Sequence, residues 1–526
     1  MNVRDAFYEV LRAHGITTVF GNPGSNELPL LRDFPADFRY ILGLQEGAVV
    51  AMADGFAQAT GRPALVNLHA AAGMGNAMGN LTNTQAGHVP LIVTSGQQAR
   101  KYEELNAYLS NVDAPKLAEP LVKWSHEPAR PQDVPQSLSK GILLATAAPT
   151  GPVYLSLPLD DWDHDADESA LGHLKARAVE GNPVVSEEAL GRLAERLAGA
   201  ANPVMVAGSD IDTPAGWDGA VRLAEKLSMP VFTAPMPYRC PFPTRHPAFR
   251  GILPAGIPTL AGHFQGHDLV VVFGAPVFRY HEFADGNYLP EGTELRAVTA
   301  DPDEASRAPF GQILIGDPSD ALKRLADALP DAGRPPLPSR QLTPADTTGP
   351  AFTWEAILDA VNAAKTADTV IAHEWTSADI WDRLEFSRPG SLYGEEAGGL
   401  GWGLPAAIGL QLGDPSRRVV ALLGDGSMQY TVSGLWTAAQ HNIPVVFVVA
   451  RNGEYRALKL LGRLMHAPQT PGMELPGLDI PAIAAGYGVQ SERVDTLSDL
   501  THAVKEALAA EQPYLIEVPE RRVAST

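Results

Sequence analysis

Short apolar runs recur along the whole chain, and a stretch with helical spacing separates each run from the next. Clear examples are "ALVNLH", "PLIVTSG", "PVMVAGS", "LVVVFGAP", "RVVALLGDG" and "PVVFVVARN". Continuous apolar strands that alternate with helices are typical of parallel sheets covered on both faces. The pattern therefore predicts the α/β class.

The length predicts more than one domain, because 526 residues exceed what a single hydrophobic core serves. An acidic stretch from about 160 to 183 and a proline-rich stretch from about 329 to 350 resemble linkers. Division there leaves segments 1–165, 183–330 and 350–526, each of ordinary domain size. We expect three doubly wound parallel-sheet domains.

Composition argues against several classes of partner. The formal net charge is −21, which opposes nucleic-acid binding. No run reaches the roughly 20 apolar residues of a membrane span, and the first residues lack the apolar core of a signal peptide. The single cysteine, Cys240, excludes an intrachain disulfide and favours a cytoplasmic protein.

Asp425 and Asn452 follow two successive apolar strands that a helical stretch connects. Such a crossover makes the strands parallel, so both residues should lie at the carboxyl edge of one sheet, where α/β proteins bind ligands. The flanking Gly424 and Gly426 allow phosphate oxygens to approach backbone N–H groups. Carboxylate and amide oxygens suit Mg²⁺ or Ca²⁺, which would bridge to a diphosphate. A tight strand-to-helix turn capped by Asp425 is the alternative that the residues leave open.

A Gly-Asp-Gly followed about 25 residues later by Asn is the signature of thiamine diphosphate-dependent enzymes. The chain resembles the benzoylformate decarboxylases of this family along its whole length. The matching stretches are "TVFGNPGSNELPLLRDFPADFRYILGLQE", "NLHAAAGMGNAMG", "NVDAPKLAEPLVKWS", "CPFPTRHPAFRG", "GAPVFRYH" and "AGGLGWGLPAAIG". The resemblance implies pyrimidine-binding, central and diphosphate-binding domains in that order. It also implies thiamine diphosphate with Mg²⁺ or Ca²⁺, and a homotetramer with active sites between subunits.

The resemblance assigns roles to individual residues. Glu46 would activate the cofactor through its aminopyrimidine ring, and Ser25, His69 and His281 would be the polar catalytic groups. The implied cofactor contacts are Thr376, Ser377, Gly398, Leu400, Gly424, Asp425, Gly426, Ser427, Asn452 and Tyr455. The implied metal ligands are Asp425, Asn452 and the backbone carbonyl of Glu454, and the implied pocket wall is Leu109, Leu458 and Leu461. Without the family, a glutamate in the first turn of a helix or a lone histidine is more often structural.

The implied reaction is the non-oxidative decarboxylation of a 2-keto acid to an aldehyde and CO₂, with an aryl substrate such as benzoylformate. One alternative is a carboligase of the acetolactate synthase type, and another is decarboxylation of a different 2-keto acid. A third alternative is a cofactor-binding protein without activity. The presence of Glu46, Asp425 and Asn452 argues against it.

The chain departs from the family pattern around the expected cofactor site. Gly394, Glu395 and Glu396 stand where aromatic and small apolar residues are usual in the family, and Arg451 and Arg456 are also new. Leu461 replaces an aromatic residue, and Glu454 replaces a threonine. Because unpaired buried charge is unfavourable, we expect the two acids to pair with the two arginines behind an apolar pocket. An inward, unpaired arginine would instead favour a substrate with a second anionic group.

Overall fold

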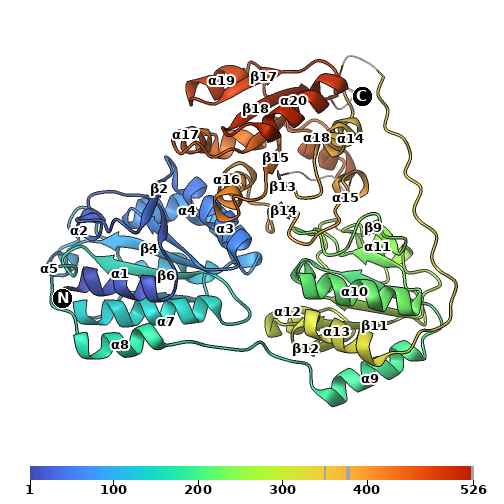
Figure 1. The fold of residues 1–526 in the computed structure, drawn as a ribbon, viewed down its shortest axis with the longest axis horizontal. Coiled ribbons are helices and arrows are strands. Elements are labelled where there is room, and N and C mark those ends of the chain that lie inside the picture. Colours follow the sequence, from blue (N-terminus) through green and yellow to red (C-terminus); the bar gives the residue numbers. More distant parts are fainter. Residues whose placement is uncertain (283, 349–350, 375–378, 523–526) are drawn as a thin grey trace.

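A computed structural model describes residues 1–526 except 283, 349–350, 375–378 and 523–526. The described residues form three sheets of six strands, and every paired strand is parallel to its neighbour. Helices cover both faces of the sheets (Figure 1). The predicted α/β class with three doubly wound sheets is confirmed.

The N-terminal sheet has the strand order β2-β1-β3-β4-β6-β5. Its strands are β1 (Thr18–Asn22), β2 (Arg39–Leu42), β3 (Ala64–Leu68), β4 (Leu91–Gln97), β5 (Trp124–His126) and β6 (Val153–Pro158). Its longer helices are α1 (Val3–Ala13), α3 (Glu46–Thr60), α4 (Ala70–Ala86), α7 (Val134–Thr146) and α8 (Glu168–Ala176). The short helices α2 (Leu28–Leu31), α5 (Arg100–Glu103) and α6 (Ala114–Ala118) lie in its loops.

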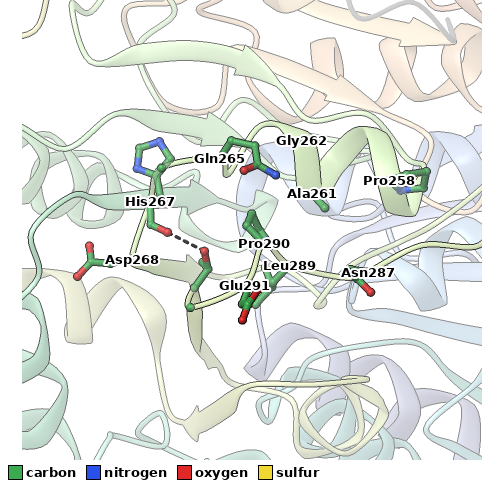
Figure 2. Close-up of a pocket in the computed structure, with 13 residues that line it drawn as sticks. Pro258, Ala261, Gly262, Gln265, His267, Asp268, Asn287, Leu289, Pro290 and Glu291 are labelled. Carbon is green, nitrogen blue, oxygen red and sulfur yellow. Dashed lines mark hydrogen bonds between the residues drawn. The ribbon is translucent and has the colours of Figure 1, made fainter.

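The central sheet has the order β12-β11-β10-β7-β8-β9. Its strands are β7 (Pro203–Ala207), β8 (Val231–Thr233), β9 (Phe249–Ile252), β10 (Leu269–Phe273), β11 (Glu294–Thr299) and β12 (Gln312–Ile315). Its helices are α9 (Glu187–Ala198), α10 (Pro214–Leu227), α11 (Ile257–Gly262), α12 (Pro302–Arg307) and α13 (Pro318–Ala328). A surface pocket of about 600 Å³ lies beside His267 and Asp268, where β10 begins (Figure 2). Because ligands of α/β sheets bind at the opposite, carboxyl edge, this pocket is not the candidate active site.

The C-terminal sheet has the order β14-β13-β15-β16-β18-β17. Its strands are β13 (Val370–Glu374), β14 (Leu392–Gly394), β15 (Val419–Gly424), β16 (Val446–Arg451), β17 (Gln490–Arg493) and β18 (Tyr514–Pro519). Its helices are α14 (Trp354–Ala364), α15 (Asp379–Arg383), α16 (Gly403–Gly413), α17 (Gly434–Gln440), α18 (Arg456–Leu464), α19 (Ile480–Gly486) and α20 (Leu497–Ala509). The predicted crossover between the strands that precede Asp425 and Asn452 is confirmed, with α17 as its helix.

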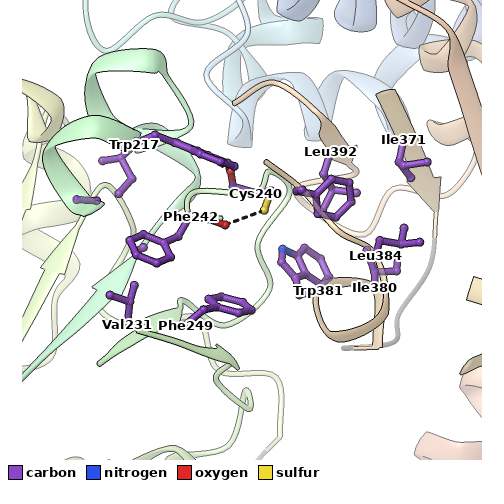
Figure 3. Packing of buried hydrophobic residues seen from close by; sticks show 14 of the residues in the cluster. Trp217, Val231, Cys240, Phe242, Phe249, Ile371, Ile380, Trp381, Leu384 and Leu392 are labelled. Carbon is purple, nitrogen blue, oxygen red and sulfur yellow. Dashed lines mark hydrogen bonds between the residues drawn. The ribbon is translucent and has the colours of Figure 1, made fainter. Parts of the chain in front are cut away.

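The hydrophobic core is continuous between the central and C-terminal sheets. Trp217 and Phe242 of the central segment belong to the same buried cluster as Trp381 and Leu392 of the C-terminal segment (Figure 3). Cys240 is buried in this cluster. The shared core holds the two sheets together.

A close crossing of α3 and α16 joins the N-terminal and C-terminal sheets. A Cβ atom on Gly409 would lie 1.9 Å from the carbonyl oxygen of Met52, so this approach requires glycine. The buried Asp54 accepts hydrogen bonds from Trp402 at 3.0 Å and Thr84 at 2.8 Å. This contact places the carboxyl edge of the N-terminal sheet near the loop that precedes α16.

The acidic stretch expected as a linker contains α8, whose Leu174 packs into the core beside α1 and α7. The proline-rich stretch has no helix or strand in its described residues. Across the described chain, we find no helix with the length and apolar character that crossing a membrane requires.

Candidate active site

Asp425 and Asn452 lie side by side at the carboxyl edge of the C-terminal sheet. Asp425 follows β15 and Asn452 follows β16, and these strands are neighbours. Asp425 Oδ2 accepts a 2.7 Å hydrogen bond from the N–H of Gly453, so the loop after β16 closes onto this carboxylate. Burial raises the pKa of Asp425, while the surrounding backbone N–H groups oppose that effect. The two oxygen ligands predicted from the sequence are brought together.

The Asn452 side chain is held from both ends. Its Oδ1 accepts from the N–H of Glu454 at 2.9 Å, and its Nδ2 donates to Glu520 at 2.7 Å. Glu520 also pairs with Arg456, and burial raises the pKa of Glu520 to about 7. The side chain of Glu454 pairs with Lys459 and Arg522, so only its backbone carbonyl is available to an ion.

The Gly-Asp-Gly turn has no room for a side chain at Gly426. A Cβ on Gly426 would lie 2.9 Å from the ring of Tyr455. Ser427 Oγ lies 3.2 Å from both the N–H and the carbonyl oxygen of Gly424. The predicted contacts Gly424, Gly426, Ser427 and Tyr455 therefore form one group around Asp425.

The loop that carries Gly398 and Leu400 lies between α4 and β13. Asn83 donates to the carbonyl of Gly399 at 2.7 Å. Glu374, at the end of β13, accepts from the N–H groups of Gly401 and Gly403. Burial raises the pKa of Glu374 to about 7. Gly398 is exposed with φ +73°, and Leu400 is half-buried.

Thr376 and Ser377 directly follow β13 in sequence but lie outside the described residues. Their predicted contact with the diphosphate stays a prediction.

Glu46 begins α3 at the carboxyl edge of the N-terminal sheet and is 8% exposed. Its two carboxylate oxygens accept hydrogen bonds from Asn22 at 3.1 Å and Asn76 at 3.0 Å. The two amide groups are uncharged donors that hold the carboxylate in one orientation. In this orientation the carboxylate can be presented to the ring of a ligand.

His69 follows β3 and is oriented by Glu27, a residue that sequence reasoning missed. Glu27 Oε2 lies 2.8 Å from His69 Nδ1 and also accepts from the N–H of Gly24 at 2.8 Å. Its other oxygen accepts from the N–H groups of Ala70 and Gly96. Glu27 is only 1% exposed. The sequence feature that could have indicated this role is a charged residue placed between the small residues and the apolar stretch of "GNPGSNELPLL".

Ser25 is exposed on the loop that Gly24 and Glu27 anchor, so it lies close to His69 in the fold. His281 is exposed on the long loop that follows β10. Among the described residues no hydrogen bond or ion pair joins the His281 side chain to His69.

The predicted pocket wall is open in the single chain. Leu109 and Leu461 are half-buried, and Leu458 is 48% exposed. None of the three belongs to a hydrophobic cluster of described residues. Helix α18, which carries Leu458 and Leu461, has no buried residue at all.

The predicted charge pairing does not occur. Glu396 pairs with Arg279, Arg451 with Glu517 and Arg456 with Glu520. The reason is the strand order. Three strand spacings of about 4.8 Å separate β14, which precedes the two acids, from β16, which ends at Arg451 and leads to Arg456. Glu395 keeps a buried oxygen without a hydrogen-bond partner, and burial raises its pKa well above the ordinary value.

These residues fit thiamine diphosphate and a divalent ion. The turn at Gly426 would clash with any side chain, and Asp425, Asn452 and the Glu454 carbonyl are a hard oxygen set. Glu46 and its two amides are available for the pyrimidine. No described contact joins Glu46 to Asp425 within one chain.

Comparison with protein families defines the class. The model of the N-terminal thiamine pyrophosphate-binding domain matches residues 1–117, that of the central domain 190–325, and that of the C-terminal thiamine pyrophosphate-binding domain 376–518. The chain belongs to the thiamine pyrophosphate enzyme family.

Individual relatives narrow the similarity within this family. Benzoylformate decarboxylase of Pseudomonas aeruginosa is 52% identical, with 99% of each chain covered. The structure of the thiamine diphosphate-dependent 4-hydroxybenzoylformate decarboxylase of Rhodococcus jostii RHA1 is 47% identical, covers 100% of each chain and has a TM-score of 0.98. That of benzoylformate decarboxylase from Polynucleobacter necessarius is 40% identical, covers 100% of each chain and has a TM-score of 0.96.

Proposed function

We propose that this enzyme decarboxylates an aryl 2-keto acid to an aldehyde and CO₂ with thiamine diphosphate. The observation that carries the proposal is the full-length identity of 52% to a benzoylformate decarboxylase. Glu46, Ser25, His69 and His281 stand at the positions that the family resemblance assigns to catalysis. Bound thiamine diphosphate supplies the electron sink that lets a 2-keto acid lose CO₂.

The residues of the chain then have separate tasks. Glu46 holds the aminopyrimidine ring through its carboxylate and exchanges a proton with it. His69, oriented by the buried Glu27, moves protons at the reacting carbonyl, with Ser25 beside it. His281 serves the same centre from the central segment. Each of these proton transfers contributes a factor of about 10²–10⁴ in typical enzymes.

The C-terminal segment holds the diphosphate and its ion. Asp425, Asn452 and the carbonyl of Glu454 would hold Mg²⁺ or Ca²⁺, and Thr376, Ser377 and Ser427 would contact the diphosphate. The proposed pyrimidine-binding, central and diphosphate-binding parts span 1–165, 183–330 and 350–526, and α8 packs onto the first part through Leu174.

Assembly completes the site, and we propose a cytoplasmic homotetramer. Glu46 and Asp425 do not meet within one chain, and the apolar wall around α18 is uncovered. Large apolar side chains are exposed both on α18 and in the loop after α5, a pattern that marks protein interaction surfaces. These residues are Leu458, Leu460, Leu464 and Met465 on or beside α18, and Tyr102, Leu105, Tyr108 and Val112 near α5.

A second candidate substrate has a hydroxyl group on the ring. Glu395 has a buried carboxyl oxygen without a hydrogen-bond partner, and burial raises the pKa of this carboxyl, which favours its neutral form. A neutral carboxyl can both donate and accept a hydrogen bond, which suits a phenol better than a second carboxylate. The related structure from Rhodococcus jostii RHA1 is that of a 4-hydroxybenzoylformate decarboxylase.

The test is CO₂ release from a panel of 2-keto acids without any added acceptor. Benzoylformate, 4-hydroxybenzoylformate, pyruvate and 2-oxoglutarate cover the aryl, hydroxyaryl, small and dicarboxylic classes. We expect the aryl pair to give CO₂ and aldehyde in equal amounts. Turnover of pyruvate alone, with a carboligation product in place of free aldehyde, would establish the acetolactate synthase-type alternative.

A further inference from the structure

A second cluster of ionisable residues lies where all three segments of the chain meet. His88 follows α4 of the N-terminal segment, Asp301 and Glu304 belong to the start of α12, and Glu396 follows β14. Figure 1 shows α12 at the end of the central segment that faces the N-terminal sheet. The proposed reaction uses none of these residues.

The geometry of three of them suits a single ion. The closest ligand atoms of His88, Asp301 and Glu304 all lie within 4.8 Å of one another, and His88 Nε2 is 3.6 Å from Asp301 Oδ2. Two ligands about 2.1 Å from a tetrahedral metal stand roughly 3.4 Å apart. Small side-chain rotations would therefore complete the coordination.

The carboxylates are already oriented by other groups. Asp301 uses Oδ1 to cap α12 through the N–H of Asp303 at 2.7 Å, which leaves Oδ2 facing His88. Glu304 Oε2 accepts from Thr299 Oγ1 at 3.1 Å, which leaves Oε1 free. Such supporting hydrogen bonds are the usual surroundings of metal ligands.

An independent observation points to a cation as the ligand of this cluster. Glu396 lines the same small pocket as His88 and Glu304, and its side chain is 5% exposed. Its Oε1 pairs with Arg279, but its Oε2 is buried without a hydrogen-bond partner. Asp210 also lines the pocket, so three carboxylates line it together with one arginine and one histidine, and Asp301 contacts that histidine from outside the lining. Burial raises the pKa of both Glu304 and Glu396.

The size of the pocket limits the ligand. Its cavity volume is about 20 Å³. A water molecule needs roughly 10–15 Å³ by the same kind of measure, so the space takes one small ion and excludes a nucleotide or an organic cation. An imidazole with carboxylates favours a first-row divalent transition metal over Mg²⁺.

We propose that His88, Asp301 and Glu304 form a second divalent metal site, for an ion such as Zn²⁺, that clamps the N-terminal segment to the central one. Glu396, which belongs to the C-terminal segment, partly balances the charge of the ion. This site is separate from the ion at Asp425.

The test counts metal in the holoenzyme. Protein saturated with thiamine diphosphate and Mg²⁺ is titrated with Zn²⁺, desalted and analysed for both metals, and Co²⁺ serves as the spectroscopic probe. We expect one Zn²⁺ per chain in addition to the Mg²⁺, and a higher melting temperature on zinc binding. His88→Gln and Glu304→Gln should each weaken zinc binding by about 100-fold or more, and Thr299→Val by about 10-fold.

Matched controls separate this site from others. His173→Gln, which removes an exposed histidine of α8, should bind zinc like the wild type. Asp425→Ala should retain the junction zinc even though it loses the cofactor ion, so failure of one site does not mimic failure of the other. Circular dichroism and cofactor binding report whether His88→Gln is folded. The proposal would be overturned if folded His88→Gln bound zinc as well as the wild type does, or if zinc bound only by displacing Mg²⁺. It would also be overturned if the wild-type protein bound no zinc, which would mean that protons neutralise the carboxyls.

Discussion

Glu46 is held between Asn22 and Asn76, two donors that match a carboxylate and not an amide. Glu46→Gln keeps the shape of the side chain but places an NH₂ group against one of these donors. We expect exchange of the C2 proton of bound thiamine diphosphate to slow by about 10²-fold or more, while cofactor binding changes far less. The measurement is hydrogen–deuterium exchange followed by NMR after acid quenching. Exchange at the wild-type rate would remove Glu46 from catalysis.

Glu27 is predicted to be a positioning residue that acts through His69. In Glu27→Gln the N–H groups of Gly24, Ala70 and Gly96 share one acceptor oxygen in place of two. We expect a loss of about 1–3 kcal/mol in the free energy of unfolding and a fall of about 10²-fold in kcat, with KM less affected. If Glu27 acts through the imidazole, adding Glu27→Gln to His69→Ala should lower kcat no further. Additive losses in the double variant would show an independent role.

Glu395 gives a pH-dependent prediction. In the folded state the pKa of Glu374 is about 7 and that of Glu395 is raised well above its usual value, whereas both ionise near pH 4.3 when unfolded. Above that pH these two groups hold more protons in the folded protein than in the unfolded chain. Their contribution to the free energy of unfolding therefore falls as pH rises from about 4.5 to 7.

Glu395→Leu removes one buried acid whose folded-state pKa is raised, so the free energy of unfolding should fall less steeply with pH in this variant. Urea unfolding at pH 5 and pH 8 measures the difference. The control is Glu188→Leu, where an exposed acid is replaced. An equally steep fall in Glu395→Leu would mean that Glu395 ionises in the folded protein.

At the scale of elements, the ends of β15 and β16 carry the ion-binding prediction. Asp425 lies just beyond β15, so Asp425→Ala should keep the sheet and lose thiamine diphosphate affinity by about 10²-fold or more. EDTA should release cofactor and divalent ion together from the wild type. Equilibrium dialysis gives the affinity, and circular dichroism reports the fold. Asp495→Ala, at another exposed acid of the C-terminal segment, should bind normally. Full cofactor retention in Asp425→Ala would exclude this metal site.

At the scale of the whole molecule, the uncovered face of α18 predicts the assembly. Leu460 and Leu464 are both about half exposed, and two buried aspartates in a subunit interface are strongly unfavourable. The double variant Leu460→Asp, Leu464→Asp should shift the protein to smaller species in light scattering and lose activity with them. Val179→Asp, at an exposed valine outside the sheets, should leave the assembly intact. A variant that keeps the wild-type mass would place the interface elsewhere.

The sequence by itself determined the α/β class, the three sheets and the placement of Asp425 and Asn452 at the ends of neighbouring strands. Each depends on local order, because an apolar strand followed by a helix fixes which edge a terminal residue reaches. The sequence did not predict which charged residues pair, because partners such as Arg456 and Glu520 are brought together only by the order of strands in the sheet.

Tertiary structure alone decided that Glu27 orients His69 and that His88 meets Asp301. These residues are distant in the chain, and their contacts arise where loops of separate sheets or strands converge. Short-range patterns of hydrophobicity carry no information on such contacts, because they depend on how whole layers pack against one another.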